Sequence, residues 1–132
     1  MTDFSLDQHA LIRAGETLVR QCHGASFAAG WWHDLNTGEL YDADAKVPEK
    51  LMLTVSELAE AMEGHRKNLA DDKLPHRSML EVELADAVIR IADLAGRLSL
   101  DLGGAIAEKM AFNANRPDHK IAVRREAGGK AY

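Results

Sequence analysis

Two acidic pairs with the same internal spacing stand out in this 132-residue sequence: Glu57 with Glu60, and Glu83 with Asp86. A separation of three residues places both carboxylates of a pair on one face of an α-helix. Four carboxylates held close together would repel one another and lose hydration unless a cation lay among them. Because oxygen ligands suit hard divalent ions, the pairs predict a site for Mg²⁺, with Mn²⁺ as the alternative.

A cationic face follows the acids along the chain. Lys109, Asn113 and Arg116 are spaced i, i+4 and i+7, so they share one face of a predicted helix. Magnesium held by few protein ligands commonly shares its coordination with phosphate, which makes these residues candidates for phosphate contacts. The alternative is that the two cations only balance the helix dipole and that Asn113 is a surface amide. The acids of the third predicted helix, taken alone, favour a solvated charged face over a site.

The ordered combination of these motifs resembles the MazG-like branch of the all-α nucleoside triphosphate pyrophosphohydrolases. The pattern is Glu57-x-x-Glu60, a 22-residue spacer, Glu83-x-x-Asp86, then Lys109-x-x-x-Asn113-x-x-Arg116. The resemblance covers residues 48–120. Relatives within that superfamily include dimeric dUTPases, dCTP pyrophosphatases and phosphoribosyl-ATP pyrophosphohydrolase. It implies Mg²⁺-dependent hydrolysis of an ordinary, deoxy or non-standard nucleoside triphosphate to the monophosphate and pyrophosphate.

The resemblance also implies roles for the residues in the pattern. The four acids would be the metal ligands, and Glu57 and Glu60 are the candidate catalytic residues, with Glu60 orienting or deprotonating the attacking water. Lys109, Asn113 and Arg116 would contact phosphate or sugar oxygens of the substrate. The family builds its sites within dimers or dimers of dimers, so a homo-oligomer is expected. The rival interpretation is a catalytically silent helical protein that binds nucleotide or metal as a scaffold.

Two further features are open to more than one interpretation. Trp31 and Trp32 precede the first acidic pair, where they would either stack on the nucleobase or anchor the core or a dimer interface. Arg90 follows Asp86 at i+4, and the pair between them is preferred over a contact of Arg90 with phosphate.

The elements that must position these residues are helices. The pattern predicts a helix from about residue 6 to 23 after a Ser5–Gln8 capping box, and a long connection over residues 24–47. A second helix is expected from Pro48 to Gly64, and a third over residues 79–100 after a Ser78–Glu81 capping box. The remaining elements are a break at Gly103–Gly104, a fourth helix to Asn115 that Pro117 stops, and a basic tail over residues 118–132 that either frays or folds over the site.

Periodicity also assigns faces to these helices. One apolar stripe of the second helix is expected to be core: Leu51, Val55, Leu58 and Met62. Leu53, Glu57 and Glu60 form a second stripe, which predicts that the acids face a seam between helices. The third helix is apolar around most of its circumference and carries one charged strip, in which Asp86–Arg90 and Asp93–Arg97 are the expected i,i+4 pairs.

The whole-chain composition limits the class of protein. The net charge is −5, so the chain lacks the basic surface that binding of a nucleic acid polymer requires. Cys22 is the single cysteine, which excludes an internal disulfide and fits a cytoplasmic location. No apolar run approaches the length of a membrane span. Because Ala and Leu are plentiful and aromatic residues make up 5%, we expect one all-α domain over residues 1–117, an antiparallel bundle of four to five helices.

Overall fold

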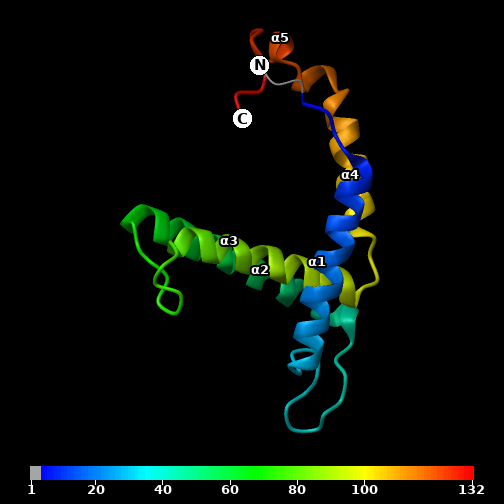
Figure 1. Ribbon diagram of the computed structural model, residues 1–132, viewed down its shortest axis with the longest axis vertical. Coiled ribbons are helices and arrows are strands. Elements are labelled where there is room, and N and C mark those ends of the chain that lie inside the picture. The colour runs from blue at the N-terminus through cyan, green and yellow to red at the C-terminus, as the bar shows by residue number, and fades with distance from the viewer. Residues whose placement is uncertain (1–3) are drawn as a thin grey trace. The chain divides into compact units, whose positions relative to one another are not determined.

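The computed structural model describes residues 4–132, and they are helices joined by turns (Figure 1). The elements are α1 (Gln8–Ala28), α2 (Ala43–Lys67), α3 (Met79–Arg97), α4 (Leu102–Ala114), the 3-10 helix η1 (Pro117–His119) and α5 (Ile121–Arg124). Only isolated bridges, and no β-strand, occur over these residues, so the predicted all-α class is confirmed. None of the described helices is both long enough and apolar enough to cross a membrane. The chain divides into two compact units, residues 17–100 and residues 1–16 with 101–132.

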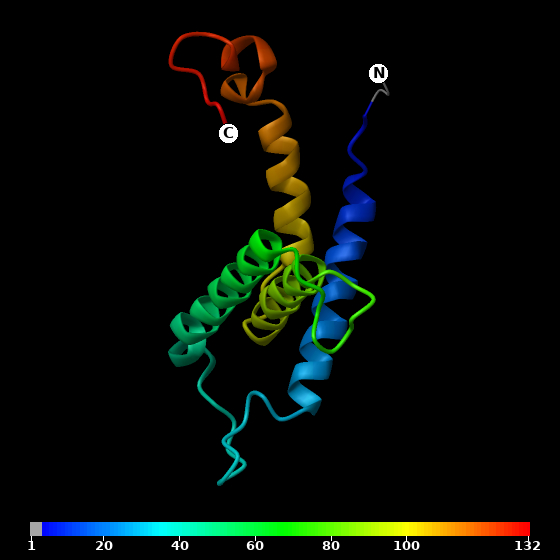
Figure 2. The ribbon, with the colours of Figure 1, turned by 90° about the vertical axis from the view of Figure 1, so that its left-hand side faces the viewer.

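The unit formed by residues 17–100 is built on an antiparallel hairpin of α2 and α3, which lie side by side in both views (Figures 1 and 2). Asp42 caps α2 by accepting a hydrogen bond from the Asp44 N–H, so the helix begins before the expected Pro48. Asn68 ends α2 with a left-handed backbone at φ 52°. The Ser78 hydroxyl accepts from the Glu81 N–H at 3.1 Å, which confirms the predicted N-cap of α3.

The segment before α2 is more ordered than the predicted connection over residues 24–47. Helix α1 continues to Ala28, which leaves residues 29–42 as the connection. Asp34 closes a turn by accepting hydrogen bonds from the N–H groups of Asn36 and Thr37 at 2.9 and 2.8 Å, and Gly38 follows with φ 73°. A bridge between His33 and Leu40 then returns the chain toward α2.

The other unit contains the first part of α1 together with α4, η1 and α5. Asp7, rather than the predicted Ser5, caps α1 by accepting from the Ala10 N–H at 2.9 Å. Gly103 is not a helix break as predicted. It lies in the first turn of α4, where the backbone of Gly15 approaches so closely that a Cβ on either glycine would clash.

The basic tail is folded on itself. Arg116 and Lys130 both pair with Asp118, each with a nitrogen 2.7 Å from Oδ2. The Arg124 guanidinium donates to the carbonyl oxygens of Lys130 and Ala131, each at 3.0 Å. Side-chain bonds therefore close residues 118–132 into a compact turn rather than a frayed end, and folding of the tail over the site stays a prediction.

The expected core stripe of α2 lies on the outside of the helix. We call this surface the outer α2 face; its members are Leu51, Met52, Val55, Leu58 and Met62, with exposed fractions of 47–66%. The buried apolar residues of this unit are instead Trp32 and Leu94 with four small side chains: Ala61, Ala87, Ala92 and Ala95. Periodicity identified the stripe correctly but placed it wrongly, because α2 turns its other face, which carries Glu57 and Gly64, toward α3.

Candidate functional site

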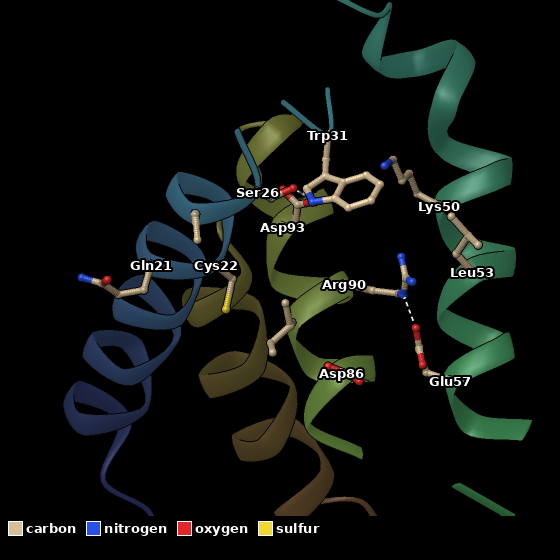
Figure 3. Close-up of a pocket in the computed structure, with 12 residues that line it drawn as sticks. Gln21, Cys22, Ser26, Trp31, Lys50, Leu53, Glu57, Asp86, Arg90 and Asp93 are labelled. Atoms are coloured by element: carbon tan, nitrogen blue, oxygen red, sulfur yellow. Dashed lines mark hydrogen bonds and ion pairs between the residues drawn. The ribbon is translucent and has the colours of Figure 1, made fainter. Parts of the chain in front are cut away.

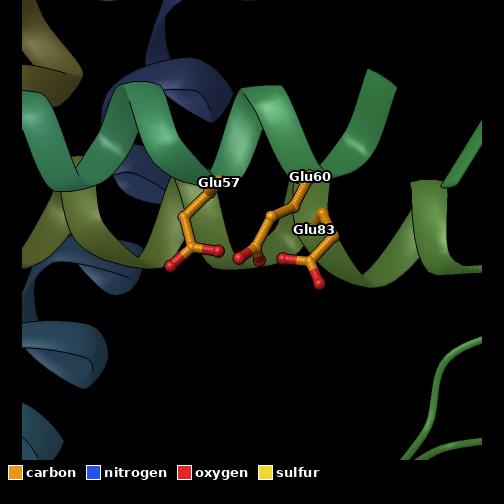
Figure 4. A group of neighbouring side chains, drawn as sticks. All are labelled: Glu57, Glu60 and Glu83. Carbon is orange, nitrogen blue, oxygen red and sulfur yellow. The ribbon is translucent and has the colours of Figure 1, made fainter. Parts of the chain in front are cut away.

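Three of the four predicted metal ligands converge between α2 and α3. Glu57, Glu60 and Glu83 each offer a carboxylate oxygen, and these oxygens lie within 4.8 Å of one another (Figure 4). We call this group the acid cluster. Small residues let the two helices approach, since Ala61 and Ala87 are buried and a Cβ at Gly64 would meet the side chain of Met79. The spacing within each pair and this close approach together create the cluster.

Burial makes the acid cluster costly unless a cation binds it. Glu57 and Glu83 are each only 8% exposed, whereas Glu60 is open to solvent. Within residues 4–132, Glu83 Oε2 is buried and has no hydrogen-bond partner. A buried acceptor without a donor is unfavourable, and the surrounding groups supply carboxylate oxygens rather than donors. The donor set therefore fits a hard divalent ion such as Mg²⁺ or Mn²⁺.

The acid cluster has unequal proton affinities. Burial raises the pKa of Glu83 to about 7, and the neighbouring carboxylates of Glu57, Glu60 and Asp86 contribute to the rise. Burial opposes ionisation of Glu57 as well, but its hydrogen bonds, chiefly the one from Arg90, outweigh this and hold the Glu57 pKa below its usual value. Burial and the charge of Glu57 raise the pKa of Asp86. Near neutral pH the metal-free cluster therefore retains a proton on Glu83 part of the time.

Arg90 pairs across the helix seam rather than along its own helix. Its Nε lies 2.6 Å from Glu57 Oε1, so the predicted i,i+4 pair with Asp86 is wrong (Figure 3). The guanidinium prefers Glu57 because that carboxylate is nearly buried and needs a partner more than the less buried Asp86 does. Asp86 stands beside the acid cluster without belonging to it.

A cavity of about 700 Å³ adjoins the acid cluster, and we call it the tryptophan cavity. Trp31 and Lys50 lie at one end, and Glu57 and Asp86 lie at the other, with Arg90 between them (Figure 3). Further wall residues are Gln21, Cys22, Ala25, Ser26, Leu53, Ile89 and Asp93. The cavity thus has an exposed aromatic ring at one end and the carboxylates of Glu57 and Asp86 at the other, with the cationic Lys50 and Arg90 on its wall.

The two tryptophans have different environments. Trp32 is completely buried, and Lys50 and Arg97 lie over its ring at 4.5 and 5.6 Å from the centroid. It is therefore the core anchor that was one of the two predicted alternatives. Trp31 is 69% exposed and lines the tryptophan cavity, so stacking on a base remains a prediction for this residue.

Asp93 is buried at the centre of a polar network that the sequence pattern did not indicate. It accepts hydrogen bonds from Ser26 Oγ at 2.8 Å and Trp32 Nε1 at 2.9 Å, and His23 Nδ1 lies 2.8 Å from its Oδ1. The predicted pair of Asp93 with Arg97 is wrong, because the Arg97 guanidinium donates to the Tyr41 carbonyl oxygen instead. Ser26 and His23 both bind Asp93 rather than each other, so they do not form a nucleophile–base pair.

A second cavity, of about 740 Å³, shares Glu57 and Asp86 with the first, and we call it the connection cavity. It contains the remaining members of the acid cluster, Glu60 and Glu83. The segment between α2 and α3 supplies the other polar wall residues: Asp71, Asp72 and Lys73. The sequence gives no sign of a site in this segment, because none of its residues repeats a recognisable ligand spacing.

The predicted phosphate-contacting residues belong to the other compact unit. Lys109 is exposed, with its Nζ 5.0 Å from the centroid of Phe112, and Asn113 Oδ1 is buried without a partner within residues 4–132. Arg116 donates two hydrogen bonds to Asp118, at 3.0 and 2.7 Å, and this pairing lowers the Asp118 pKa. Their contact with substrate stays a prediction.

No protein-family model, curated protein or solved structure matches this chain.

Proposed function

We propose that this protein hydrolyses a nucleoside triphosphate to the nucleoside monophosphate and pyrophosphate in the presence of Mg²⁺. The observation that carries the proposal is the acid cluster, in which two helices bring three carboxylates together and one buried oxygen, Glu83 Oε2, has no partner among the described residues. The sequence pattern of two acidic pairs and a later cationic face supports this reaction class over simple metal storage. Mn²⁺ is the alternative ion, because both ions accept an all-oxygen ligand set.

The acid cluster and two neighbouring residues, Asp86 and Arg90, have the following roles in this proposal. Glu57, Glu60 and Glu83 would hold the metal, and Asp86 would complete the ligand set from beside them. A bound divalent ion neutralises phosphate charge and lowers the pKa of its water. Arg90 keeps the Glu57 carboxylate ionised and oriented through the 2.6 Å bond. Glu60 is the exposed member, which makes it the acid best placed to accept a proton from incoming water.

The reaction needs no covalent intermediate. The water oxygen forms a bond to the α-phosphorus while the bond from that phosphorus to the bridging oxygen breaks. The bridging oxygen leaves on pyrophosphate, and the proton of the water passes to the Glu60 carboxylate. Phosphoryl transfer of this kind depends mainly on positioning and charge neutralisation, which is the contribution that buried acids and fixed cations supply.

The tryptophan cavity is the proposed place for the nucleoside. Its volume of about 700 Å³ is in the range of small-molecule sites. Trp31 offers an exposed aromatic face for base stacking, and Lys50 and Arg90 place positive charge on the wall between that end and the acids. This orientation directs the phosphates toward Glu57 and Asp86.

We also propose that a second copy of the chain covers the outer α2 face. The five apolar side chains of this face are each 47–66% exposed, and an exposed apolar patch of this kind marks a surface that a partner covers. The positions from Leu51 to Met62 centre on Val55 and Leu58, so an antiparallel pairing of two copies of α2 would be self-complementary. A homodimer is the simplest assembly, and a dimer of dimers would need a further surface.

The test of the function is a substrate panel with product identification. The protein is incubated with Mg²⁺ and ordinary, deoxy and modified nucleoside triphosphates, and the phosphate products are separated. We expect a monophosphate and pyrophosphate in equal amounts. Release of inorganic phosphate instead would contradict the reaction type. Binding of Mg²⁺ and nucleotide without turnover of any substrate would favour the silent scaffold.

A further inference from the structure

The connection between α2 and α3, residues 68–78, is closed into a turn by its own hydrogen bonds. A bridge joins Ala70 to Ser78, and the Asp71 N–H donates to the Arg77 carbonyl oxygen at 2.9 Å. The Asp71 side chain turns back into the segment, where its Oδ2 accepts from the N–H groups of Lys73 and Leu74 at 3.0 and 2.7 Å. Asp71 is only 8% exposed. A buried carboxylate therefore fixes the backbone from which the Lys73 side chain extends.

Lys73 lies on the wall of the connection cavity together with the whole acid cluster. It is the single basic residue among the described residues that line this cavity, which also holds Asp71, Asp72 and Asp86. Within residues 4–132 the Lys73 ammonium nevertheless has no carboxylate within ion-pair distance. Lys67, by contrast, pairs with Glu63 at 2.5 Å, although the Lys67 side chain is largely exposed.

The Lys73 side chain is exposed to solvent, although it lines the same cavity as several carboxylates. If its role were to neutralise the acids, the most favourable arrangement would be a direct ion pair, as Arg90 makes with Glu57. The acids instead converge on one another, and the buried Glu83 Oε2, on a residue that is 92% buried, has no partner in the described chain. In this arrangement the acids are available to bind a metal cation. The Lys73 ammonium is available to contact an anion coordinated to that metal.

We infer that Lys73 contacts the phosphate oxygens of a metal-bound diphosphate or triphosphate from the connection cavity. The inference rests on the proposed function, because that function supplies the phosphates and the metal. A lysine ammonium is a compact point charge that suits phosphate without demanding a fixed geometry. Because the turn at Asp71 is already formed, little backbone ordering would be lost when the phosphate binds. Asp71 is then a positioning residue that acts through Lys73.

The test measures binding directly and does not depend on turnover. Isothermal titration calorimetry follows inorganic pyrophosphate, and separately a nonhydrolysable nucleoside triphosphate analogue, both in Mg²⁺. We expect Lys73→Ala to weaken both ligands roughly tenfold, the cost of one charge-assisted contact. The matched control is Lys67→Ala, which removes an exposed lysine outside the cavity and is expected to change the affinities less than twofold. Circular dichroism checks that each variant is folded.

The positioning role of Asp71 has its own readout. Asp71→Ala removes the acceptor for the Lys73 and Leu74 N–H groups, whereas Asp71→Asn keeps an amide oxygen that can accept them. We expect the alanine variant to lose part of the pyrophosphate affinity and the asparagine variant to retain it. Asp71→Ala combined with Lys73→Ala is expected to bind no more weakly than Lys73→Ala alone. A fully additive loss would show that Asp71 does not act through Lys73.

The outcomes separate this inference from the proposed function. If the wild-type protein hydrolyses triphosphates and Lys73→Ala binds pyrophosphate as tightly as wild type, the Lys73 assignment is overturned and the function stands. If the wild-type protein binds pyrophosphate with Mg²⁺ but turns nothing over, the function fails, and the loss in Lys73→Ala still supports the phosphate contact. If the wild-type protein binds neither ligand, both are overturned.

Discussion

Arg90 on α3 donates a hydrogen bond from its Nε to Oε1 of Glu57 on α2 over 2.6 Å. The carboxylate is nearly buried, and the guanidinium is more than a third exposed. Among residues 4–132 this bond is the one cation contact of the acid cluster, and it accompanies a lowered pKa of Glu57, whereas the pKa of Glu83 is raised to about 7. The cluster therefore has one member held ionised and one that shares a proton, which leads to the predictions below.

Replacing Arg90 by alanine is expected to destabilise the metal-free protein by roughly 1–3 kcal/mol, because the buried Glu57 carboxylate loses its partner. The measurement is urea unfolding in EDTA. Arg77→Ala is the control, since Arg77 and Glu81 form a pair that is exposed on both sides, and its loss should cost less than about 1 kcal/mol. Equal losses in the two variants would contradict a special role for Arg90.

Replacing Glu60 by glutamine is expected to lower kcat by roughly 10²–10⁴-fold, because the amide cannot accept the proton of the attacking water. The fold should be intact or more stable without metal, since one of three mutually repelling carboxylates is gone. Steady-state kinetics measures the change in kcat, and thermal unfolding in EDTA measures the change in stability. Glu63→Gln, on the same helix and outside the cluster, is the control and should leave kcat unchanged.

The metal-free protein is expected to lose stability as the pH rises from about 4.5 to about 7. The folded-state pKa of Glu83 is raised from 4.5 to about 7, so the protonated form is favoured by folding. Protonation of Glu83 thus stabilises the fold fully below pH 4.5, and this stabilisation is lost as the pH rises through the folded-state pKa. The free energy of unfolding is expected to fall by an amount on the order of 3 kcal/mol. Asp86 adds to this trend because its pKa is also raised, whereas the lowered pKa of Glu57 affects stability only below about pH 4.5.

Unfolding free energies measured in urea and EDTA at pH 5 and pH 8 test this pH dependence. Glu83→Gln should remove most of the loss, because the amide does not ionise. Mg²⁺ should also reduce the loss in the wild-type protein, since a cation favours the ionised carboxylate. A Glu83→Gln variant with the same pH profile as wild type would show that another group is responsible.

Replacing Trp31 by alanine is expected to raise KM by roughly tenfold, since base stacking on an aromatic ring contributes about 1–3 kcal/mol per base. The unfolding free energy should change little, because Trp31 is 69% exposed. Leu35→Ala is the control from the same connection, where the side chain is 92% exposed and does not line the tryptophan cavity. An unchanged KM in Trp31→Ala would show that the base does not stack on Trp31.

The outer α2 face predicts the mass of the protein in solution. Light scattering after size exclusion is expected to give at least twice the monomer mass of 14.5 kDa. Leu58→Asp places a charge at the centre of the face and should shift the protein to monomer, whereas Ser56→Asp, on the exposed surface beside the face, should not. A wild-type monomer would contradict the proposed dimer.

Local features of this protein could be predicted from the sequence alone. The Ser78 cap of α3, the helical class and the pairing of Glu57 with Glu60 depend on residues three or four positions apart, and helix geometry relates such residues directly. The sequence also determined that the acids would face a seam between helices, because Leu53 begins the same stripe.

Tertiary structure decided everything that depends on which faces meet. Two apolar stripes on one helix have the same period, so periodicity alone could not show that Leu58 would be exposed while Ala61 is buried. Arg90 pairs with Glu57 rather than with Asp86, because a buried carboxylate is more unfavourable without a partner than a less buried one. Burial of the acid, and not its spacing in the sequence, determines this. The Asp93 network and the placement of Lys73 likewise join residues through folding of distant segments, which no local pattern encodes.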